Sequence, residues 1–354
     1  YTPAPHTIYK GIQKLAAGTC LIVENGSAEV KRWWNYKPQP FDPVPQKAFV
    51  KEELLELYRQ AVKSHLLSDV PLGILLSGGV DSSMLLALMN EFGENWKSFT
   101  VGYGKSFVDD ELEDAKETAN IFNSSHHSIE INQESFEETL SKIIACVEEP
   151  IASSSIVPMY HVCQKASQEV KVALMGQGPD ELFGGYTRHL GVQYGKYWRS
   201  MPGTMRKPIS KLLSLIPRNE SIRRGLYSLE EPRRMIRYQQ VFSVMSDSLI
   251  DGLFQDKVLP EGVGDLILDS WKDLETLIEK TDDLGGFQYL EIRSSLPDEL
   301  LMYGDKLSMA HSLEVRVPFL DQKIVEYVER LPSKYKVRFG NRKWIHKQVC
   351  SDYL

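Results

Sequence analysis

The amino-acid sequence predicts an α/β protein: a parallel sheet flanked by helices, followed by a helical C-terminal region. Three observations support this class. Between residues 47 and 175, short apolar runs typical of buried strands alternate with segments whose apolar residues recur at a helical period. Two of the apolar runs end in glycine-rich loops. Beyond about residue 193 the strand signal fades, and helical periodicity continues to the end of the chain, interrupted by prolines.

The alternating part of the chain predicts nine elements. Helices are expected over residues 47–67, 82–92, 112–122, 136–147 and 157–167. Strands are expected over residues 72–76, 98–101, 127–131 and 170–175. Because strands joined through helices pair in parallel, their carboxyl ends should meet at one edge of the sheet.

The first forty residues differ from the rest of the chain. Residues 18–26 are typical of a strand ending in an Asn25-Gly26 turn, and residues 28–34 of its partner. Residues 38–45 contain four prolines, which exclude a helix or a central strand and indicate a linker. We therefore divide the chain into residues 1–40, a hairpin with its linker, and residues 41–354, the main domain.

Composition excludes several classes of function. The net charge of −7 argues against a nucleic-acid-binding protein. We interpret the basic stretch from Arg199 to Arg237 as a solvated helical face. The four cysteines have no metal-ligand spacing, and no apolar run is long enough to cross a membrane. A cytoplasmic protein that binds small molecules is the expectation.

The strongest functional signal is Ser77-Gly-Gly-Val-Asp-Ser-Ser83, which follows an expected strand and opens an expected helix. Paired glycines let the backbone approach a ligand closely. Free N–H groups at the helix start attract an anion, and the serines add donors. Asp81 would repel a phosphate unless a divalent cation lay between them, so it predicts Mg²⁺. An ordinary glycine turn is the alternative, but strand, serines and Asp81 all coincide here.

A second expected strand also ends in a glycine-rich loop, Gly176-Gln-Gly-Pro-Asp-Glu-Leu-Phe-Gly-Gly185. Its acids, Asp180 and Glu181, open the next helix. Such a pair alone is ordinary at a helix N-terminus. Because the two loops should lie at the same edge of the sheet, Asp180 could hold the same cation as Asp81.

A third segment, residues 303–321, mixes apolar residues with charges that are costly to bury, among them Arg316. The mixture suggests a structured polar pocket. A salt-bridged helix surface is the alternative.

The loop Ser77–Ser83 resembles the PP-loop of ATP pyrophosphatases, which have an adenine nucleotide α-hydrolase-like fold. The three segments in this order resemble the asparagine synthetase family and its relative β-lactam synthetase, over nearly the whole chain. The resemblance implies an ATP-dependent amide-forming ligase that needs Mg²⁺. It would activate a carboxylate, with the aspartate β-carboxylate favoured, as acyl-AMP and release pyrophosphate. Ammonia would then attack to give the amide.

The resemblance also implies roles for individual residues. Lys343 would stabilise the charge that develops on phosphate, and Asp81 and Asp180 would bind Mg²⁺. Contacts to adenosine would come from Leu76, Val101 and Gly176. Contacts to pyrophosphate would come from Ser77, Gly78, Gly79, Ser82 and Ser83. Contacts to the substrate would come from Gln177, Asp180, Glu181 and Arg316.

One departure from the family pattern leaves alternatives open. Members usually carry an acid where this chain has Gln177, and an amide cannot accept a proton as a carboxylate does. The acceptor is then aspartate, or another carboxylate such as a β-amino acid precursor, a peptide or a sugar acid. A nucleotide-binding protein without catalysis is the third alternative.

A second departure concerns the ends of the chain. Glutamine-hydrolysing members begin with a glutaminase domain headed by a cysteine, whereas this chain begins with Tyr1. Its first forty residues resemble only the tail of that domain. We expect the glutaminase domain to be missing from this chain, with glutamine the nitrogen source in the full-length protein. The sequence says nothing about oligomeric state and leaves a homodimer open.

Overall fold

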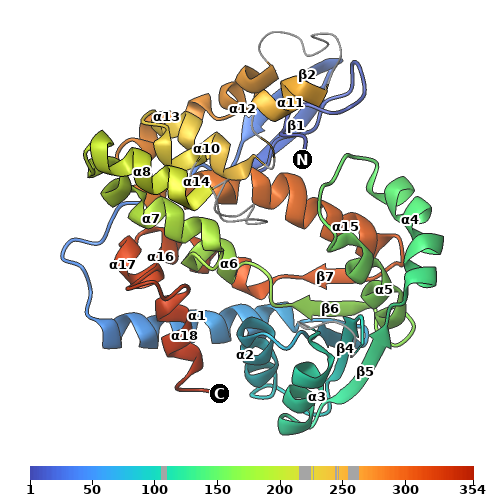
Figure 1. The fold of residues 1–354 in the computed structure, drawn as a ribbon. Helices are drawn as coiled ribbons and strands as arrows, with labels where there is room; N and C mark the ends of the chain where they lie inside the picture. Colours follow the sequence, from blue (N-terminus) through green and yellow to red (C-terminus); the bar gives the residue numbers. More distant parts are fainter. Residues whose placement is uncertain (105–109, 215–224, 226, 244, 246, 254–262) are drawn as a thin grey trace.

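The computed structural model describes residues 1–104, 110–214, 225, 227–243, 245, 247–253 and 263–354. Its central sheet has five strands in the order β5-β4-β3-β6-β7, and every pairing is parallel (Figure 1). The strands are β3 (Leu72–Leu75), β4 (Lys97–Gly102), β5 (Ser125–Glu130), β6 (Val172–Met175) and β7 (Glu314–Arg316). The predicted α/β class, with a parallel sheet flanked by helices, is confirmed.

Helices cover both faces of the sheet. On one face lie α1 (Lys47–His65), α2 (Val80–Met89), α3 (Leu112–Ile121) and α18 (Trp344–Cys350). On the other lie α4 (Gln133–Val147), α5 (Ile156–Ala166) and α15 (Met302–Met309). Successive residues of β3 alternate between them: Ile74 packs with the first set and Leu75 with the second. Burial on both faces explains why the strands are continuous apolar runs in the sequence.

Each of the nine elements expected between residues 47 and 175 is present, with ends shifted by a few residues. The region beyond residue 193 is mainly helical as expected, but it also contributes β7 to the sheet, a strand that the sequence did not reveal. Three residues in a polar segment carry no strand pattern of their own. Pairing with β6 imposes the extended conformation.

The remaining helices form a second layer around the carboxyl ends of the strands. They are α6 (Pro179–Phe183), α7 (Thr187–Ser200), α8 (Gly203–Ser214), α10 (Arg234–Phe242), α11 (Asp247–Leu253), α12 (Val263–Ser270), α13 (Lys272–Ile278), α14 (Asp283–Arg293), α16 (Gln322–Glu329) and α17 (Ser333–Lys336), with the π-helix η1 (Leu296–Leu301) and the 3-10 turn η2 (Pro318–Leu320). Trp271, Tyr238 and Phe287 pack in a core of their own there.

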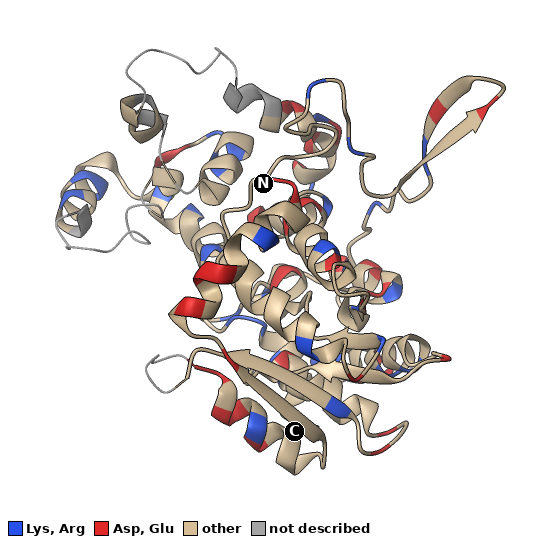
Figure 2. Ribbon diagram, turned by 90° about the vertical axis from the view of Figure 1, so that its right-hand side faces the viewer, with Lys and Arg blue, Asp and Glu red and all other residues tan. Residues whose placement is uncertain are grey.

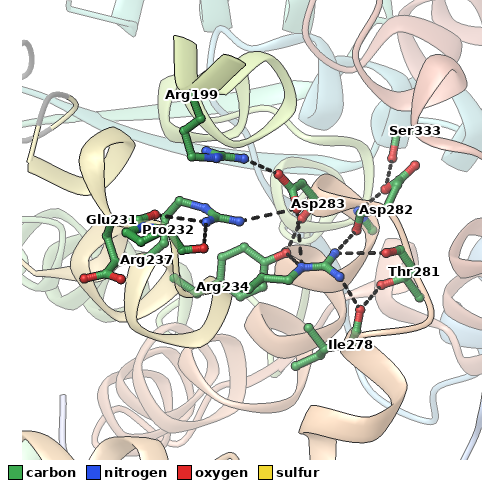
Figure 3. Close-up of polar contacts among 12 residues, drawn as sticks. Arg199, Glu231, Pro232, Arg234, Arg237, Ile278, Thr281, Asp282, Asp283 and Ser333 are labelled. Atoms are coloured by element: carbon green, nitrogen blue, oxygen red, sulfur yellow. Dashed lines mark hydrogen bonds and ion pairs between the residues drawn. The ribbon is translucent and has the colours of Figure 1, made fainter. Parts of the chain in front are cut away.

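The basic stretch from Arg199 to Arg237 is solvated only in part: Lys207, Lys211 and Arg233 are exposed, but three of its arginines are not. Arg199, Arg234 and Arg237 converge on the carboxylate of Asp283, with Arg199 Nη2 2.7 Å from Asp283 Oδ2 (Figure 3). Arg237 is only 6% exposed. The arginines tie α7 and α10 to the start of α14, a contact between distant segments that no local pattern predicts. Residues 215–224 of this stretch lie outside the described residues.

The N-terminal hairpin is formed as expected by β1 (Thr19–Glu24) and β2 (Ser27–Arg32), which pair antiparallel. Asn25 and Gly26 both have positive φ, 49° and 79°, as a two-residue hairpin turn requires. The hairpin projects from the rest of the chain (Figure 2), and every residue of β2 is exposed. The linker crosses to the main domain, where Tyr335 donates a 2.6 Å hydrogen bond to the carbonyl of Pro45. No helix in the described part of the chain is long and apolar enough to cross a membrane.

Candidate active site

The two glycine-rich loops lie side by side at the carboxyl ends of β3 and β6. The chain runs from β3 to β4 and β5 on one side, and then returns to place β6 on the other side of β3. Such a reversal opens a crevice at the ends of the two central strands, where α/β proteins bind ligands. The loops touch directly: a Cβ at Gly176 would lie 2.9 Å from the backbone nitrogen of Ser82. Only glycine allows this approach.

The first loop is held in shape by its own serines. The hydroxyl of Ser82 donates to the carbonyl of Ser77 at 2.8 Å and lies 3.0 Å from the Ser77 hydroxyl. Ser83 donates a 3.0 Å hydrogen bond to the carbonyl of Gly79. The backbone N–H of Gly78 donates to the carboxylate of Glu111. A loop N–H that already holds a carboxylate is consistent with the predicted anion cradle.

The strand edge beside this loop supplies the residues expected to contact adenosine. Leu76 continues β3, and its N–H donates a 2.8 Å hydrogen bond to the carbonyl of Phe99 on β4. Val101 lies on β4 and is half-buried, and Gly176 lies between the loops. The structure therefore brings these three positions to the same edge of the sheet.

Lys343 joins the two predicted metal ligands. Its ammonium nitrogen lies 2.6 Å from Asp81 Oδ2 and 2.8 Å from Asp180 Oδ1. Gly185 makes room for this arrangement, because a Cβ there would lie 1.8 Å from Asp180 Oδ1 and 2.3 Å from Lys343 Cε. The backbone of Lys343 is left-handed, with φ 52° and ψ 37°. Such strain in a non-glycine residue costs on the order of 1–3 kcal/mol and often marks a functional site.

The electrostatics keep Asp81 and Lys343 charged. Burial alone would raise the pKa of Asp81, but His346 and Lys343 lower it below its usual value. Burial alone would lower the pKa of Lys343, but Asp81 and Asp180 raise it. A cation shared by two carboxylates at this position is the charge pattern that a metal-nucleotide site needs.

Sequence reasoning gave no role to His346, which completes the site. Its Nε2 lies 3.0 Å from Asp81 Oδ1. His346 follows Lys343 by three positions, in the first turn of α18, and both side chains reach the carboxylate of Asp81. That spacing was the signal in the sequence that could have identified it.

Glu181 lies behind the loops, away from solvent. It is 1% exposed, and its Oε1 accepts a 2.5 Å hydrogen bond from the Tyr186 hydroxyl. Its Oε2 has no hydrogen-bond partner among the described residues. Burial and the nearby charge of Glu291 raise the pKa of Glu181 to about 8. Gln177, by contrast, is half-buried in the loop between β6 and α6.

The structure does not bring Arg316 to this site. Its guanidinium donates to the carbonyls of His65 and Leu67, both at 2.7 Å, and to the carboxylate of Glu314. Those carbonyls belong to the end of α1 and to the segment before β3. Arg316 therefore satisfies carbonyls at the C-terminus of α1, and residue 316 is left without a contact to the two loops.

The donor set fits Mg²⁺ in the way that nucleotide enzymes use it. Within the described ranges, no group of three or more His, Cys, Asp or Glu residues gathers that could hold a metal alone. Asp81 and Asp180 supply two carboxylates in one place. Mg²⁺ is commonly held by one or two carboxylates together with substrate phosphates, so the two residues suffice once a nucleotide completes the shell.

A parallel sheet whose central strands end in glycine loops around paired carboxylates defines an α/β nucleotide-binding domain of the PP-loop type. Comparison with known protein families identifies the family: the sequence model of the family described as asparagine synthase matches residues 53–354 of this chain. This chain belongs to the asparagine synthase family.

Individual relatives agree with that assignment. The chain is 29% identical to asparagine synthetase [glutamine-hydrolyzing] 1 of Bacillus subtilis, over 99% of this chain and 54% of the relative. It is 31% identical to asparagine synthetase B [glutamine-hydrolyzing] of Escherichia coli, over 51% of this chain and 34% of the relative. It is also 26% identical to a protein of Penicillium rubens named amidase chyE, over 98% of this chain and 57% of the relative. The chain spans about half the length of the curated relatives that it matches along its whole length.

Proposed function

We propose that this chain carries out the synthetase half of an asparagine synthetase-like reaction. It activates the β-carboxylate of aspartate as an acyl-adenylate, releases pyrophosphate, and forms asparagine when ammonia attacks. The single observation that carries the proposal is the ammonium of Lys343 between Asp81 and Asp180, where two glycine loops meet. Membership of the asparagine synthase family supports the same chemistry.

Each part of the site has a role in this proposal. The ring and ribose of ATP lie against Leu76, Val101 and Gly176 at the strand edge. The Ser77–Ser83 loop directs its backbone N–H groups and hydroxyls at the pyrophosphate. Gln177 and Asp180 lie beside the acceptor carboxylate in the second loop, and the buried Glu181 supports that loop through its hydrogen bond with Tyr186. Lys343 supports the charge that builds up between the α-phosphate and the departing pyrophosphate.

Asp81 and Asp180 would hold the Mg²⁺ that family members generally need. When bound, the cation neutralises phosphate charge and orients the oxygens for in-line displacement. Lys343 occupies that position between the carboxylates here. Its side chain is flexible, and its ammonium has three N–H donors, so it can turn toward phosphate oxygens while a metal takes the carboxylates.

The nitrogen source is inferred from the relatives of this chain. The bacterial relatives are named as glutamine-hydrolysing, and this chain spans only 54% of the first. We assign residues 1–40 to the tail of a glutaminase domain and its linker, and residues 41–354 to the synthetase domain. As in the relatives named glutamine-hydrolysing, glutamine would be the source of the ammonia.

A different acceptor is the second candidate, and Gln177 favours it. The acid usual at this position in the family is an amide here, so the handling of the attacking amine differs. A relative of this chain is named an amidase rather than a synthetase. The same adenylation of another carboxylate, as in β-lactam synthetases, agrees with both observations.

A pyrophosphate-release assay tests both candidates. The chain is incubated with ATP, Mg²⁺ and ammonium, with aspartate or with a panel of amino acids, peptides and sugar acids. Formation of AMP, pyrophosphate and asparagine is expected with aspartate. Pyrophosphate only with another carboxylate would transfer the proposal to that acceptor. ATP binding without AMP from any acceptor would reject the ligase function.

A further inference from the structure

His346 occupies an apolar chamber beside the site. Its side chain is fully buried and is surrounded by aromatic rings from three other elements. The Phe183 ring stacks on the imidazole at 5.2 Å, and those of Phe319 and Tyr58 approach it edge-on at 5.6 and 5.7 Å. A polar ring in such surroundings is unfavourable unless its nitrogens have partners.

Both ring nitrogens are satisfied. Nδ1 lies 2.9 Å from the hydroxyl of Tyr58, and Nε2 lies 3.0 Å from Asp81 Oδ1. An ionised carboxylate can only accept hydrogen bonds, so Nε2 carries a proton and donates it to Asp81. Tyr58 is itself fully buried on α1, so the chain Tyr58–His346–Asp81 runs from the core to the edge of the nucleotide crevice.

The two oxygens of Asp81 have different partners. Oδ2 faces Lys343, whose ammonium also serves Asp180, and Oδ1 faces His346. Lys343 ends in a flexible four-carbon stem, whereas the imidazole is fixed by the surrounding rings. If phosphates draw the ammonium away, the contact of Asp81 with His346 is the one that persists.

We propose that His346, held by Tyr58, is a positioning residue that keeps Asp81 aimed at the metal-nucleotide site while Lys343 changes partners. The inference rests on the proposed function, because it takes Mg²⁺-ATP as the ligand of Asp81. Groups that orient a ligating carboxylate through a hydrogen bond typically contribute about 10- to 100-fold to metal affinity or activity. His346 and Tyr58 meet that description with buried, well-formed contacts.

The test compares two substitutions that separate shape from hydrogen bonding. His346→Leu fills the chamber but removes the donor, and His346→Gln can restore an N–H toward Asp81. Mg²⁺-dependent binding of the non-cleavable α,β-methylene analogue of ATP is measured by calorimetry, so no turnover is needed. We expect His346→Leu to bind about 10- to 100-fold more weakly, with most of that loss recovered in His346→Gln. Tyr58→Phe should weaken binding in the same direction by a smaller factor.

Controls separate positioning from folding. His311→Leu removes a different imidazole, which is half-buried and packs on the ring of Tyr160. This variant should bind the analogue as the wild type does. Melting temperatures of all variants are recorded without ligand. If His346→Leu does not fold, Tyr58→Phe and His346→Gln carry the test, and wild-type affinity in Tyr58→Phe with a loss in His346→Gln would overturn the proposal.

The remaining outcomes are distinct from failure of the proposed function. Unchanged binding in a folded His346→Leu variant would overturn the positioning role even where the wild type releases pyrophosphate. Weakened binding in that variant, recovered by glutamine, would support it. Those binding data retain their meaning if the wild type releases no pyrophosphate with any acceptor, a result that would reject the ligase function alone.

Discussion

Lys343 and Asp81 are 262 residues apart in the sequence and form a 2.6 Å ion pair at the end of β3. The same ammonium lies 2.8 Å from Asp180, at the end of β6. Two carboxylates, from the start and the middle of the main domain, therefore contact one ammonium group from its end. These ion pairs hold the charged groups of the site in fixed positions, and such preorganisation is what electrostatic catalysis requires.

Lys343→Met tests that charge directly, because methionine keeps part of the aliphatic stem and removes the ammonium. We expect pyrophosphate release to fall by about 100- to 1000-fold. Asp81 and Asp180 would lose their shared partner, and the phosphates would lose a donor. Lys347→Met, an exposed position on the same helix, is the matched control and should behave as the wild type. A Lys343→Met variant within a few-fold of the wild type would remove Lys343 from the reaction.

Gly185→Ala tests the space that the ion pairs need. The new Cβ would lie 1.8 Å from Asp180 Oδ1 and 2.3 Å from Lys343 Cε, so both must move. A displacement of about 1 Å at reacting groups can lower activity about 100-fold, and we expect a loss of that order in steady-state turnover. Gly191→Ala on α7 meets nothing within 4 Å. It should keep full activity and gain up to about 1 kcal/mol of stability, and equal losses in both variants would contradict the prediction.

The amide side chain of Gln177 leads to a prediction about how the use of ammonia depends on pH. An amide cannot take a proton from ammonium, so the wild type should use only ammonia that is already neutral. The kcat/KM for added ammonia should then rise about tenfold per pH unit below the pKa of ammonium. Gln177→Glu places a carboxylate, which can take the proton of ammonium, in the second glycine-rich loop. The rise of kcat/KM with pH should then become flatter. A flat profile in the wild type, measured at saturating ATP, would show that another group accepts the proton.

The buried carboxylate of Glu291 leads to a prediction about how the free energy of unfolding depends on pH. It is fully buried between Arg188 and His189, with His189 Nε2 at 2.9 Å. Burial alone would raise its pKa, but His189 and Arg188 lower it below the usual 4.5. Glu291 therefore stabilises the fold above about pH 4.5, and the contribution is lost as the pH falls through the lower pKa of the folded state.

Glu291→Gln should accordingly reduce the free energy of unfolding by roughly 1.5–3 kcal/mol at pH 7, because Arg188 and His189 lose hydrogen bonds to a charged carboxylate. The difference from the wild type should shrink as the pH falls below 4.5, in urea titrations at each pH. Glu169→Gln breaks a partly exposed pair with Lys97 and should leave the free energy of unfolding close to that of the wild type, because water screens such pairs. A difference for Glu291→Gln that does not depend on pH would contradict the assigned charge.

Arg316→Met distinguishes a structural arginine from a substrate contact. Loss of the hydrogen bonds to the carbonyls of His65 and Leu67 should lower the free energy of unfolding by roughly 1.5–3 kcal/mol. The KM for the acceptor should stay unchanged, because the guanidinium of Arg316 is already bonded to Glu314, His65 and Leu67. A raised KM for the acceptor without a loss of stability would show that Arg316 contacts the substrate after all.

The fold was predictable where local patterns are strong. The apolar runs before Ser77 and Gly176 are buried on both faces. Of the helices between them, α3 and α4 bury one apolar face, and α2 is buried on nearly every side. β7 was missed because only pairing with β6 makes its three residues a strand. The arginines around Asp283 were misinterpreted for a related reason: charge along the sequence does not reveal which charges become buried together.

The sequence by itself determined the class of this protein, because a strand, a turn and a helix start are local, and their residues lie next to one another in the chain. It therefore contained the loops, the two aspartates and the family pattern. Only the tertiary structure decided that Asp81 and Asp180 share the ammonium of Lys343. It also decided that the buried His346 contacts Asp81, and that Arg316 binds the carbonyls of His65 and Leu67. Those contacts join segments that are distant along the chain, and the packing of helices on the sheet sets their distances.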